Sequence, residues 1–406
     1  YGACRMCMVE NKWGGLDAAC STIPKAGMEI RTNTERLRKY RKNILELLLA
    51  NHCRDCTTCN NNGKCKLQDL AMRFQGVRFP NTAAKPLLDE SSPCITKDAH
   101  KCILCGDCVR MCNEIQNVGA IDFAHRGSKM TISTAFGRPI ADSPCVGCGQ
   151  CAAVCPTGAI IVKNDTQRVW LALDDKSTKV TAQIAPAVRV ALGKEMGLAA
   201  GENAMGQIVA ALRKMGFDEV YDTSTGADLT VLEEANELIK RLEDNNNDMP
   251  LFTSCCPAWV QFCEKKYPEL LPNVSTCRSP MHMFASLLHE ENRNSSRKHF
   301  HVGIMPCTAK KFEATREELK LDGQSPVDAV ITTQELIQMI KESGIVFDEI
   351  EPEAVDMPFG TATGAGVIFG VTGGVTEAVL RRVSADKSRA SLATIAYQGI
   401  RGMEGV

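Results

Sequence analysis

The distribution of cysteine constrains this chain more than any other feature. Sixteen of its 21 cysteines lie between residues 1 and 155, and five lie in the rest of the 406-residue chain. The count is odd, several pairs have CxxC spacing, and no secretory signal precedes them, so a disulfide framework is disfavoured. Thiols clustered in this way indicate metal binding.

Two cysteine runs share one spacing, with intervals of two, two and three residues, and Pro156 follows the second run. This is the pattern of bacterial two-cluster ferredoxins, in which the fourth cysteine of each run ligates the other cluster. We therefore expect one 4Fe-4S cluster on Cys102, Cys105, Cys108 and Cys155, and another on Cys145, Cys148, Cys151 and Cys112. A pair of zinc ribbons is the alternative, but zinc ribbons use separated CxxC pairs rather than four thiols per run.

A third candidate site precedes these runs and consists of His52, Cys56, Cys59 and Cys65. Spacing alone fits a zinc site of three cysteines and one histidine equally well. We favour a 4Fe-4S cluster because the site lies directly upstream of two others and would add a step to an electron-transfer chain. Cys53 is then a spare thiol.

Three cysteines near the start of the chain, Cys4, Cys7 and Cys20, form a fourth candidate site. The segment from Cys4 to Glu10, with the later Ala18-Ala19-Cys20, resembles the β-grasp 2Fe-2S ferredoxin module that opens large iron-sulfur oxidoreductase subunits. We expect a truncated 2Fe-2S site whose fourth ligand lies upstream of Tyr1.

Patterning of apolar residues predicts several folded parts. Residues 1–38 hold short apolar patches of a β-rich module. A helix is expected over 37–51, with Leu37, Tyr40, Ile44, Leu47 and Leu48 on its apolar face. From about residue 166, strand-like runs at 188–192 and 329–332 alternate with helical stretches at 204–215, 229–243 and 333–342, which indicates an α/β domain.

We therefore expect a multidomain α+β and α/β protein. The expected domains are a partial 2Fe-2S domain (1–38), a small 4Fe-4S domain with one histidine and three cysteine ligands (39–90), a two-cluster ferredoxin-like domain (91–165) and an incomplete α/β catalytic domain (166–406). A turn at 245–250 should lead into a buried strand that ends near Cys255, and strand ends are where sites gather.

Two motifs in the second half are not needed for electron transfer alone. They are Thr253-Ser254-Cys255-Cys256-Pro257-Ala258-Trp259 and the run from Met305 to Glu313, Met-Pro-Cys-Thr-Ala-Lys-Lys-Phe-Glu. They resemble the first two of three signature motifs of the FeFe hydrogenases. The order of the upstream cluster sites is similar to that of the large modular members, so the resemblance covers essentially the whole chain.

The resemblance implies roles for these residues. Cys256 and Cys307 would ligate the 4Fe-4S part of the H-cluster, and Cys255 would be the thiol that passes protons. Lys310 would hold a cyanide ligand of a two-iron subsite that also carries CO, as a fixed ammonium suits an anionic ligand in a dry pocket. Met305, Pro306 and Phe369 would shape the pocket.

A proton relay is also implied. Glu234, Glu237 and Arg241 have spacings that place them on one helix face. In the family, residues matching Arg241, Glu237, Ser275 and Glu234 relay protons to the cysteine that matches Cys255. The alternative is an ordinary solvated acidic face.

Several other features have simpler interpretations. The glycine-rich run 360–370 fits neither GxGxxG nor GxxxxGK[ST], so we interpret it as backbone packed closely against the cofactor. Cys94, Cys263 and Cys277 are expected to be small buried hydrophobes, and the four histidines from His282 to His301 to be surface or core residues.

The sequence departs from the family at three places. The third signature motif, which supplies two further thiolates, is absent. We expect a chain cut at both ends, because residues 396–402 still follow the family. Met281 stands where the family often has Gln, and Ala309 where it often has Ser, so the hydrogen bias or inhibition is expected to be tuned there.

The leading hypothesis is thus an FeFe hydrogenase catalytic subunit that interconverts protons and H2. The alternatives are a non-catalytic electron-transfer or assembly protein (complex-I-like or hydrogenase-like) and a hydrogen sensor. The N-terminal clusters fit a complex-I-like subunit equally well, but Cys255-Cys256 and the 305–310 motif favour the enzyme. A sensor would have altered relay residues or fused signalling domains.

Partners follow from charge and from the resemblance. With 47 Lys and Arg against 48 Asp and Glu, the chain lacks the basic excess of nucleic-acid binders, and no apolar run reaches the roughly 18 residues of a membrane span. The electron partner is expected to be ferredoxin or an NADH-oxidising flavoprotein subunit. Redox chemistry alone predicts a cytoplasmic location, since a targeting peptide ahead of Tyr1 would not be visible.

Overall fold

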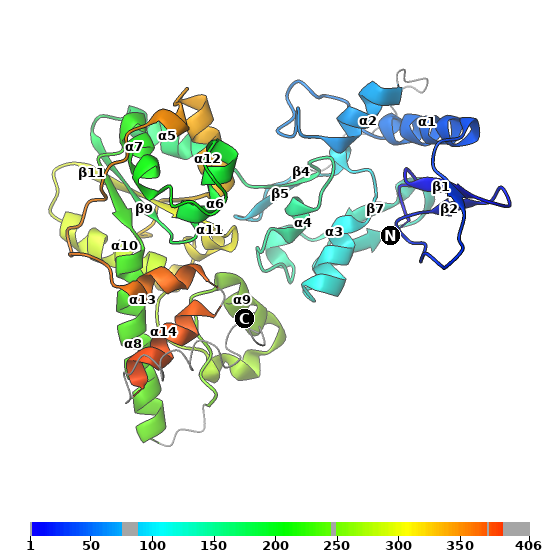
Figure 1. The fold of residues 1–406 in the computed structure, drawn as a ribbon. Coiled ribbons are helices and arrows are strands. Elements are labelled where there is room, and N and C mark those ends of the chain that lie inside the picture. The colour runs from blue at the N-terminus through cyan, green and yellow to red at the C-terminus, as the bar shows by residue number, and fades with distance from the viewer. Residues whose placement is uncertain (1, 75–87, 245–248, 372, 385–406) are drawn as a thin grey trace. The chain divides into compact units, whose positions relative to one another are not determined.

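A computed structural model describes residues 2–74, 88–244, 249–371 and 373–384. It divides into two compact units, Tyr1–Lys163 and Asn164–Val406 (Figure 1). The predicted boundary after residue 165 lies two residues from this division. The expected turn at 245–248 and the family-like segment 396–402 lie outside the described residues.

The first unit opens with a small antiparallel sheet of order β2-β1-β3, formed by β1 (Met8–Asn11), β2 (Leu16–Ala18) and β3 (Ile30–Arg31). Met8 pairs with Ala18, and both pack with the buried Leu37 of α1 (Glu35–Ala50). The Thr34 side chain accepts from the amide of Leu37 and so begins the helix.

The predicted helix at 37–51 is confirmed, but the prediction of which residues form its buried face was partly wrong. Leu47 is 53% exposed, whereas Leu45 and Leu49 are buried. Leu45 and Leu49 pack with Leu67 of α2 (Lys66–Phe74). In the second half of α1, the buried face is therefore the one that α2 covers.

The rest of the first unit is built on short elements. A three-stranded antiparallel sheet has the order β4-β5-β8, and β6 and β7 form a hairpin. The bounds are β4 (Leu88–Asp89), β5 (Ile95–Asp98), β6 (Asp122–Ala124), β7 (Thr131–Ser133), β8 (Ile160–Val162), α3 (Asp107–Arg110) and α4 (Gln150–Ala153).

The second unit contains a parallel sheet of order β10-β9-β11-β12, made of β9 (Thr178–Ile184), β10 (Glu219–Asp222), β11 (Lys298–Met305) and β12 (Ala329–Thr332). Ile184 pairs with Asp222 and Ile304, and Met305 pairs with Thr332. All four carboxyl ends therefore meet at one edge, where sites gather in parallel sheets.

Helices accompany this sheet as the alternating pattern predicted. They include α5 (Thr166–Asp174), α7 (Met205–Met215), α8 (Ser224–Glu243), α9 (Pro257–Lys266), α10 (Pro280–Asn292), α11 (Ala309–Glu313), α12 (Thr333–Glu342), α13 (Gly364–Val367) and α14 (Gly374–Val383). The strands are largely buried, with Val180, Ala182 and Ile184 of β9 in the apolar core and the polar side chains of Thr181 and Gln183 buried between them. In the described ranges no helix is long and apolar enough to cross a membrane.

Two predicted strands were wrong. Residues 188–192 contain the helix α6 (Val188–Ala191), because Val188 and Leu192 are one helical turn apart and both fully buried. The strand expected before Cys255 is only an isolated bridge between Phe252 and Val274. The strand that leads to the 305–313 motif, β11, is long and central instead.

Candidate functional site

Two cavities of the first unit are each lined by four cysteines. Their thiols are Cys102, Cys105, Cys108 and Cys155 in one cavity, and Cys112, Cys145, Cys148 and Cys151 in the other. These are the two crossed sets predicted from the sequence. Four thiols around an otherwise largely apolar cavity are the donor set of a 4Fe-4S cluster.

Burial controls the chemistry of these thiols. Desolvation, with the neighbouring cysteines adding to it, raises the pKa of Cys105 and of Cys108 to about 12. The pKa of Cys151 is shifted upward by the same causes. The thiols therefore hold their protons in the apoprotein, and cluster binding must release them because the thiolate is the ligand.

The two cysteine runs fold in the same way. Leu104 and Gly106 have positive φ in the first run, and Gly147 and Gly149 have it at the same offsets in the second. A four-residue helix begins at the next position in each, α3 and α4. These turns direct backbone amides at sulfur, with Leu104 donating to Cys102 at 3.4 Å and Gly147 to Cys145 at 3.4 Å. Such bonds help to set a cluster's potential.

The site at His52 has a buried, unpartnered nitrogen. Nε2 of His52 has no hydrogen-bond partner among the described residues, while Nδ1 accepts from the amide of Arg54 at 3.0 Å. Iron binding at Nε2 would move the ring proton to Nδ1 and break that contact. Burial, followed by the charges of Cys65, Cys59 and Cys53, raises the pKa of Cys56, so these thiols are neighbours. His52, Cys56, Cys59 and Cys65 stay a predicted ligand set, because the described residues contain no close group of three such donors.

The N-terminal candidate site includes an exposed cysteine, Cys20, beside the half-buried Cys4 and Cys7. Gly2 donates its amide to the sulfur of Cys20 at 3.2 Å. A hydrogen bond from Cys7 is the main cause that lowers the pKa of Cys20, so these two sulfurs are adjacent.

In the second unit, the two predicted H-cluster ligands lie where helices begin. Cys307 follows the end of β11 and precedes α11, and Cys256 is the residue before Pro257 of α9. Burial raises the pKa of Cys307, against the opposing charge of Lys310. Met305 is buried, whereas Pro306 is exposed.

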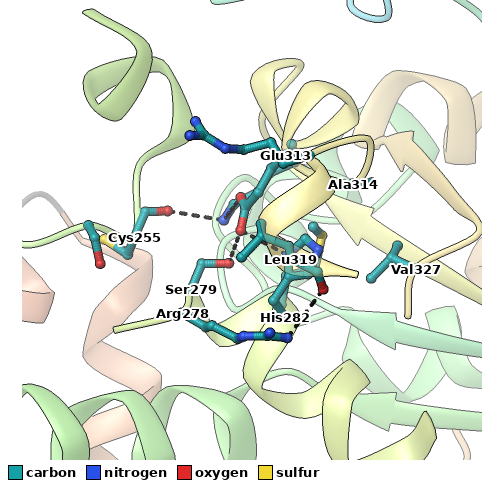
Figure 2. A network of polar contacts seen from close by, with 12 residues as sticks. Cys255, Arg278, Ser279, His282, Glu313, Ala314, Leu319 and Val327 are labelled. Atoms are coloured by element: carbon teal, nitrogen blue, oxygen red, sulfur yellow. Dashed lines mark hydrogen bonds and ion pairs between the residues drawn. The ribbon is translucent and has the colours of Figure 1, made fainter. Parts of the chain in front are cut away.

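Lys310 is held by a buried polar network, of which Figure 2 labels Cys255, Ser279, His282 and Glu313. Its ammonium donates to Oε2 of Glu313 at 2.5 Å and to the carbonyl oxygen of Cys255 at 3.0 Å. Ser279 and His282 donate to the other oxygen of Glu313, His282 at 2.9 Å. Burial opposes ionisation of Glu313, but Lys310 and His282 outweigh it and hold its pKa at about 2. The carboxylate thus fixes the ammonium beside the Cys255 loop.

The predicted relay residues lie together on α8 and on the segment that follows the 252–274 bridge. Arg241 donates to Glu237 at 2.6 Å, and Ser275 donates to the other oxygen of Glu237 at 2.7 Å. Glu234 accepts from the amide of Ser254 at 3.3 Å, and its Oε2 is buried without a hydrogen-bond partner in the described part of the chain.

Burial is the largest influence on the pKa values of Glu234 and Cys255. It raises the pKa of Glu234 to about 7, against the opposing hydrogen bond from the amide of Ser254. It also raises the pKa of Cys255 to about 11, with Lys310 opposing and Glu234 adding to the shift. A carboxyl group poised near neutral pH next to a buried thiol can give and take protons.

The glycine-rich run packs against protein backbone. A Cβ on Gly366 would lie 2.4 Å from the carbonyl oxygen of Ser224, so α13 approaches α8 as only glycine allows. Phe369 follows and is half-buried. Met281 and Ala309 are buried. Of the three spare cysteines, Cys94 and Cys263 are buried as predicted, whereas Cys277 is only partly so.

Sequence reasoning missed the residues that support the lysines. Glu313 is three residues from Lys310 on α11, a spacing that predicts an ion pair. Lys311 is buried and pairs with Asp165 and Glu335, each at 2.9 Å. No local signal links Asp165 to residue 311, so this contact was not predictable from spacing.

Comparison with known proteins agrees with this geometry. Residues 178–406 match the model of the iron only hydrogenase large subunit, C-terminal domain. Residues 41–77 match the NADH-ubiquinone oxidoreductase-G iron-sulfur binding region, and residues 101–159 match the 4Fe-4S dicluster domain.

Individual proteins similar to this chain include two hydrogenase subunits and one solved structure. The chain is 40% identical over 417 residues to the NADP-reducing hydrogenase subunit HndD of Solidesulfovibrio fructosivorans. This match covers 100% of the chain and 71% of the relative. It is 38% identical to iron hydrogenase 1 of Clostridium pasteurianum, over 99% of this chain and 71% of the relative. A solved variant of the FeFe hydrogenase HydA1 from Chlamydomonas reinhardtii is 43% identical, with a TM-score of 0.48, over 54% of this chain and 57% of that one.

Proposed function

We propose, since the chain belongs to the iron-only hydrogenase large-subunit family, that it catalyses the reversible reduction of protons to H2 at an H-cluster. Electrons would arrive through the iron-sulfur clusters of the first unit. The observation that carries this proposal is that Glu234 contacts Ser254 and Lys310 contacts Cys255, so both side chains converge on the half-buried loop that leads to the exposed ligand candidate Cys256.

The cofactor set follows from the donor sets. We infer three accessory 4Fe-4S clusters, one at each of the two four-cysteine cavities and one at His52, Cys56, Cys59 and Cys65. Cys4, Cys7 and Cys20 would hold a 2Fe-2S cluster. Cys256 and Cys307 would hold the cubane of the H-cluster, whose attached two-iron subsite carries CO and cyanide. When bound, this group supplies the iron chemistry that joins protons and electrons.

The protein's contribution is position, charge and protons. Lys310, fixed by Glu313, would hold an anionic ligand beside the Cys255 loop. Cys255 would donate and accept the proton beside the reacting metal. Glu234 would exchange protons with Cys255, and Ser275, Glu237 and Arg241 would carry them to and from solvent. Met305, Pro306 and Phe369 would shape the pocket.

Electrons would come from ferredoxin or from an NADH-oxidising flavoprotein subunit. The iron-sulfur region at 41–77 is of a type named for an NADH-ubiquinone oxidoreductase, so the first unit alone does not separate the enzyme from an electron-transfer protein. The Cys255 loop and the Lys310 network are what favour the enzyme over that alternative and over an assembly factor.

The test uses the full-length natural protein with a matured H-cluster. Cys255→Ala should lower H2 turnover by a factor on the order of 10² or more, because it removes the group that transfers the proton. Its iron content should be unchanged, because Cys256 and not Cys255 is the ligand. Loss of iron in this variant would show that the adjacent cysteines were assigned the wrong way round.

A second set of variants tests the carboxyl groups of α8 against an exposed control. Glu234→Gln and Glu237→Gln keep size and hydrogen bonding but remove a titratable link, so turnover should fall in both. Glu269 is exposed, and Glu269→Gln should change little. If the α8 variants behave like this control, α8 carries an ordinary acidic face and not a proton path.

A further inference from the structure

The most exposed large hydrophobic side chain among the described residues lies on the segment between the two cysteine runs. Phe136 is 96% exposed and has φ of 58°. A bulky side chain is disfavoured in that left-handed region, and this ring gains no burial in return. Folding of the first unit therefore does not account for phenylalanine at this position.

The backbone under Phe136 is firmly anchored. Ile132 and Ile140 on either side are each 2% exposed. The hydroxyl of Thr134 donates to the carbonyl oxygen of Arg138 and closes the turn, and the amide of Ile140 donates to Asp89 at 2.9 Å. The ring is thus presented on a defined turn.

The surroundings of Phe136 are basic. Residues 125–141 contain His125, Arg126, Lys129 and Arg138 and no acidic residue, and the exposed acids Asp122 and Asp142 lie just outside this stretch. All four side chains are exposed. The guanidinium of Arg138 lies 5.9 Å from the ring centroid of Phe136, a cation–π arrangement that keeps charge and ring together. We call residues 125–141 the basic hairpin surface.

This surface is attached directly to a cluster site. Ile132, on β7 of the same hairpin, lines the cavity of Cys102, Cys105, Cys108 and Cys155. A protein bound on the outer side of the hairpin would be separated from this cavity by little more than the hairpin. Electron transfer between proteins needs such proximity and tolerates small, transient interfaces.

We propose that the basic hairpin surface is the docking site of a small acidic electron-carrier protein that reduces the Cys102 cluster. The proposal rests on the proposed function. In each encounter the reduced carrier loses one electron and the oxidised cluster gains it, so two encounters supply the two electrons that two protons need to form H2. Acidic side chains of the carrier would face Arg126, Lys129 and Arg138, and an apolar spot would receive Phe136.

The test measures cluster reduction directly, using the full chain with its accessory clusters. A photoreduced acidic 2Fe-2S ferredoxin is mixed with the protein, and bleaching of the 4Fe-4S absorbance gives the rate. Phe136→Asn removes the ring and keeps a residue that tolerates positive φ, and Arg138→Glu reverses one charge. At low salt each should slow reduction on the order of tenfold, and the effect of Arg138→Glu should disappear at high salt.

Two controls separate an effect on carrier docking from an effect on the clusters or on the N-terminal module. Dithionite is a small reductant that needs no docking, and it should reduce the clusters of every variant at the wild-type rate. Trp13 is 82% exposed with Lys12 4.9 Å above its ring, so Trp13→Ala and Lys12→Glu are matched changes in the N-terminal module. They should leave the carrier rate unchanged.

Equal carrier rates for wild type, Phe136→Asn and Arg138→Glu would overturn the docking site and leave the proposed function standing. Slowing only in the Trp13 and Lys12 variants would also overturn it, since the carrier would then dock at the N-terminal module. Clusters that dithionite fails to reduce in the wild-type chain would overturn both the docking site and the proposed function.

Discussion

The two units position their functional residues in opposite ways. In the first unit, Cys102, Cys105 and Cys108 lie within seven residues, and their geometry comes from one turn followed by one short helix. In the second unit, Lys310 meets the carbonyl of Cys255 from 55 positions away in the chain, through Glu313 and residues of α10. Three of the four ligands of a cluster can thus be encoded locally, with the fourth supplied by the other run, whereas the site that manages protons and charge depends on contacts between several distant elements.

The difference extends to what a single substitution does. A thiol lost from the first unit removes one cluster and leaves the other in place. A charge lost from the second unit leaves its partners buried and unpaired, which destabilises the fold itself. The predictions below test this contrast.

The largest expected effect tests the crossed ligand sets. Cys112→Ala should remove about four irons from the reconstituted chain, and so should Cys145→Ala, since both thiols bind one cluster. The double variant Cys112→Ala/Cys145→Ala should lose no more iron than either single variant. Cys112→Ala/Cys102→Ala should lose about eight, as these thiols belong to different clusters.

Iron and sulfide analysis checks this set of variants. The reverse pattern, with about eight irons lost from the 112/145 pair and about four from the 112/102 pair, would show that each run binds its own cluster. Cys94→Ala is the control, because Cys94 is buried outside both cavities and should cost no iron.

The second prediction concerns the buried ion pairs of Lys311. Its ammonium contacts Asp165, Glu335 and the carbonyl oxygen of Val330, the last at 2.6 Å. Lys311→Met should destabilise the second unit by about 3–5 kcal/mol, because two carboxylates lose their counter-charge. Urea unfolding followed by circular dichroism measures the change, and the cluster absorbance of the first unit should be unaffected before that transition.

Lys320→Met is the matched control, because the partner of Lys320, Glu317, is 83% exposed. Exposed pairs contribute about 0–1 kcal/mol. Equal effects of the two lysine variants would mean that the Lys311 network is solvated and that the contrast between the units is smaller than we infer.

Much of the first unit was predictable from sequence, for a physical reason. The cysteine spacing itself fixes which thiols share a turn, and both four-cysteine cavities contain the predicted sets. The second unit was predictable in part. Helix α12 lies over 333–342 as expected, but the helix α6 at 188–191 was predicted as a strand, because Val188, Val190 and Leu192 also alternate with period two.

The polar networks were the least predictable part. Ser279 and His282 reach Glu313 only because α10 packs on the parallel sheet next to the loop that follows β11. Nothing in the spacing of residues 279 and 313 indicates that they meet. By contrast, the relay face of α8 was visible, since Glu237 and Arg241 are four residues apart on one helix.

The third prediction concerns pH. Burial raises the pKa of Glu234 from an ordinary value near 4.5 to about 7, so between these values the folded protein binds a proton that the unfolded chain has released. Stability should therefore fall as pH rises through this window, by up to about 3 kcal/mol. Glu234→Gln has nothing to titrate there and should lose less stability than wild type between about pH 5 and pH 8.

Urea unfolding at the two pH values measures that difference. Glu269→Gln should follow the wild-type profile, because Glu269 is exposed. The stability of Glu234→Gln could instead have the same pH dependence as that of wild type. Glu234 would then ionise in the folded protein near its ordinary pKa. It could not exchange protons near neutral pH, and its proposed part in proton transfer would be wrong.

The smallest expected effect tests how closely the glycine-rich run packs in the second unit. Gly366→Ala should destabilise that unit by about 1–3 kcal/mol, because the added methyl group would lie 2.4 Å from the carbonyl oxygen of Ser224. Gly364→Ala is the control two residues away, since no heavy atom lies within 4 Å of its added Cβ. Removing a helical glycine by itself favours folding slightly, so Gly364→Ala should be neutral or stabilising. Equal behaviour of the two variants in urea unfolding would mean that α13 can move away from α8, and that the run 360–370 needs glycine for some reason other than this close approach.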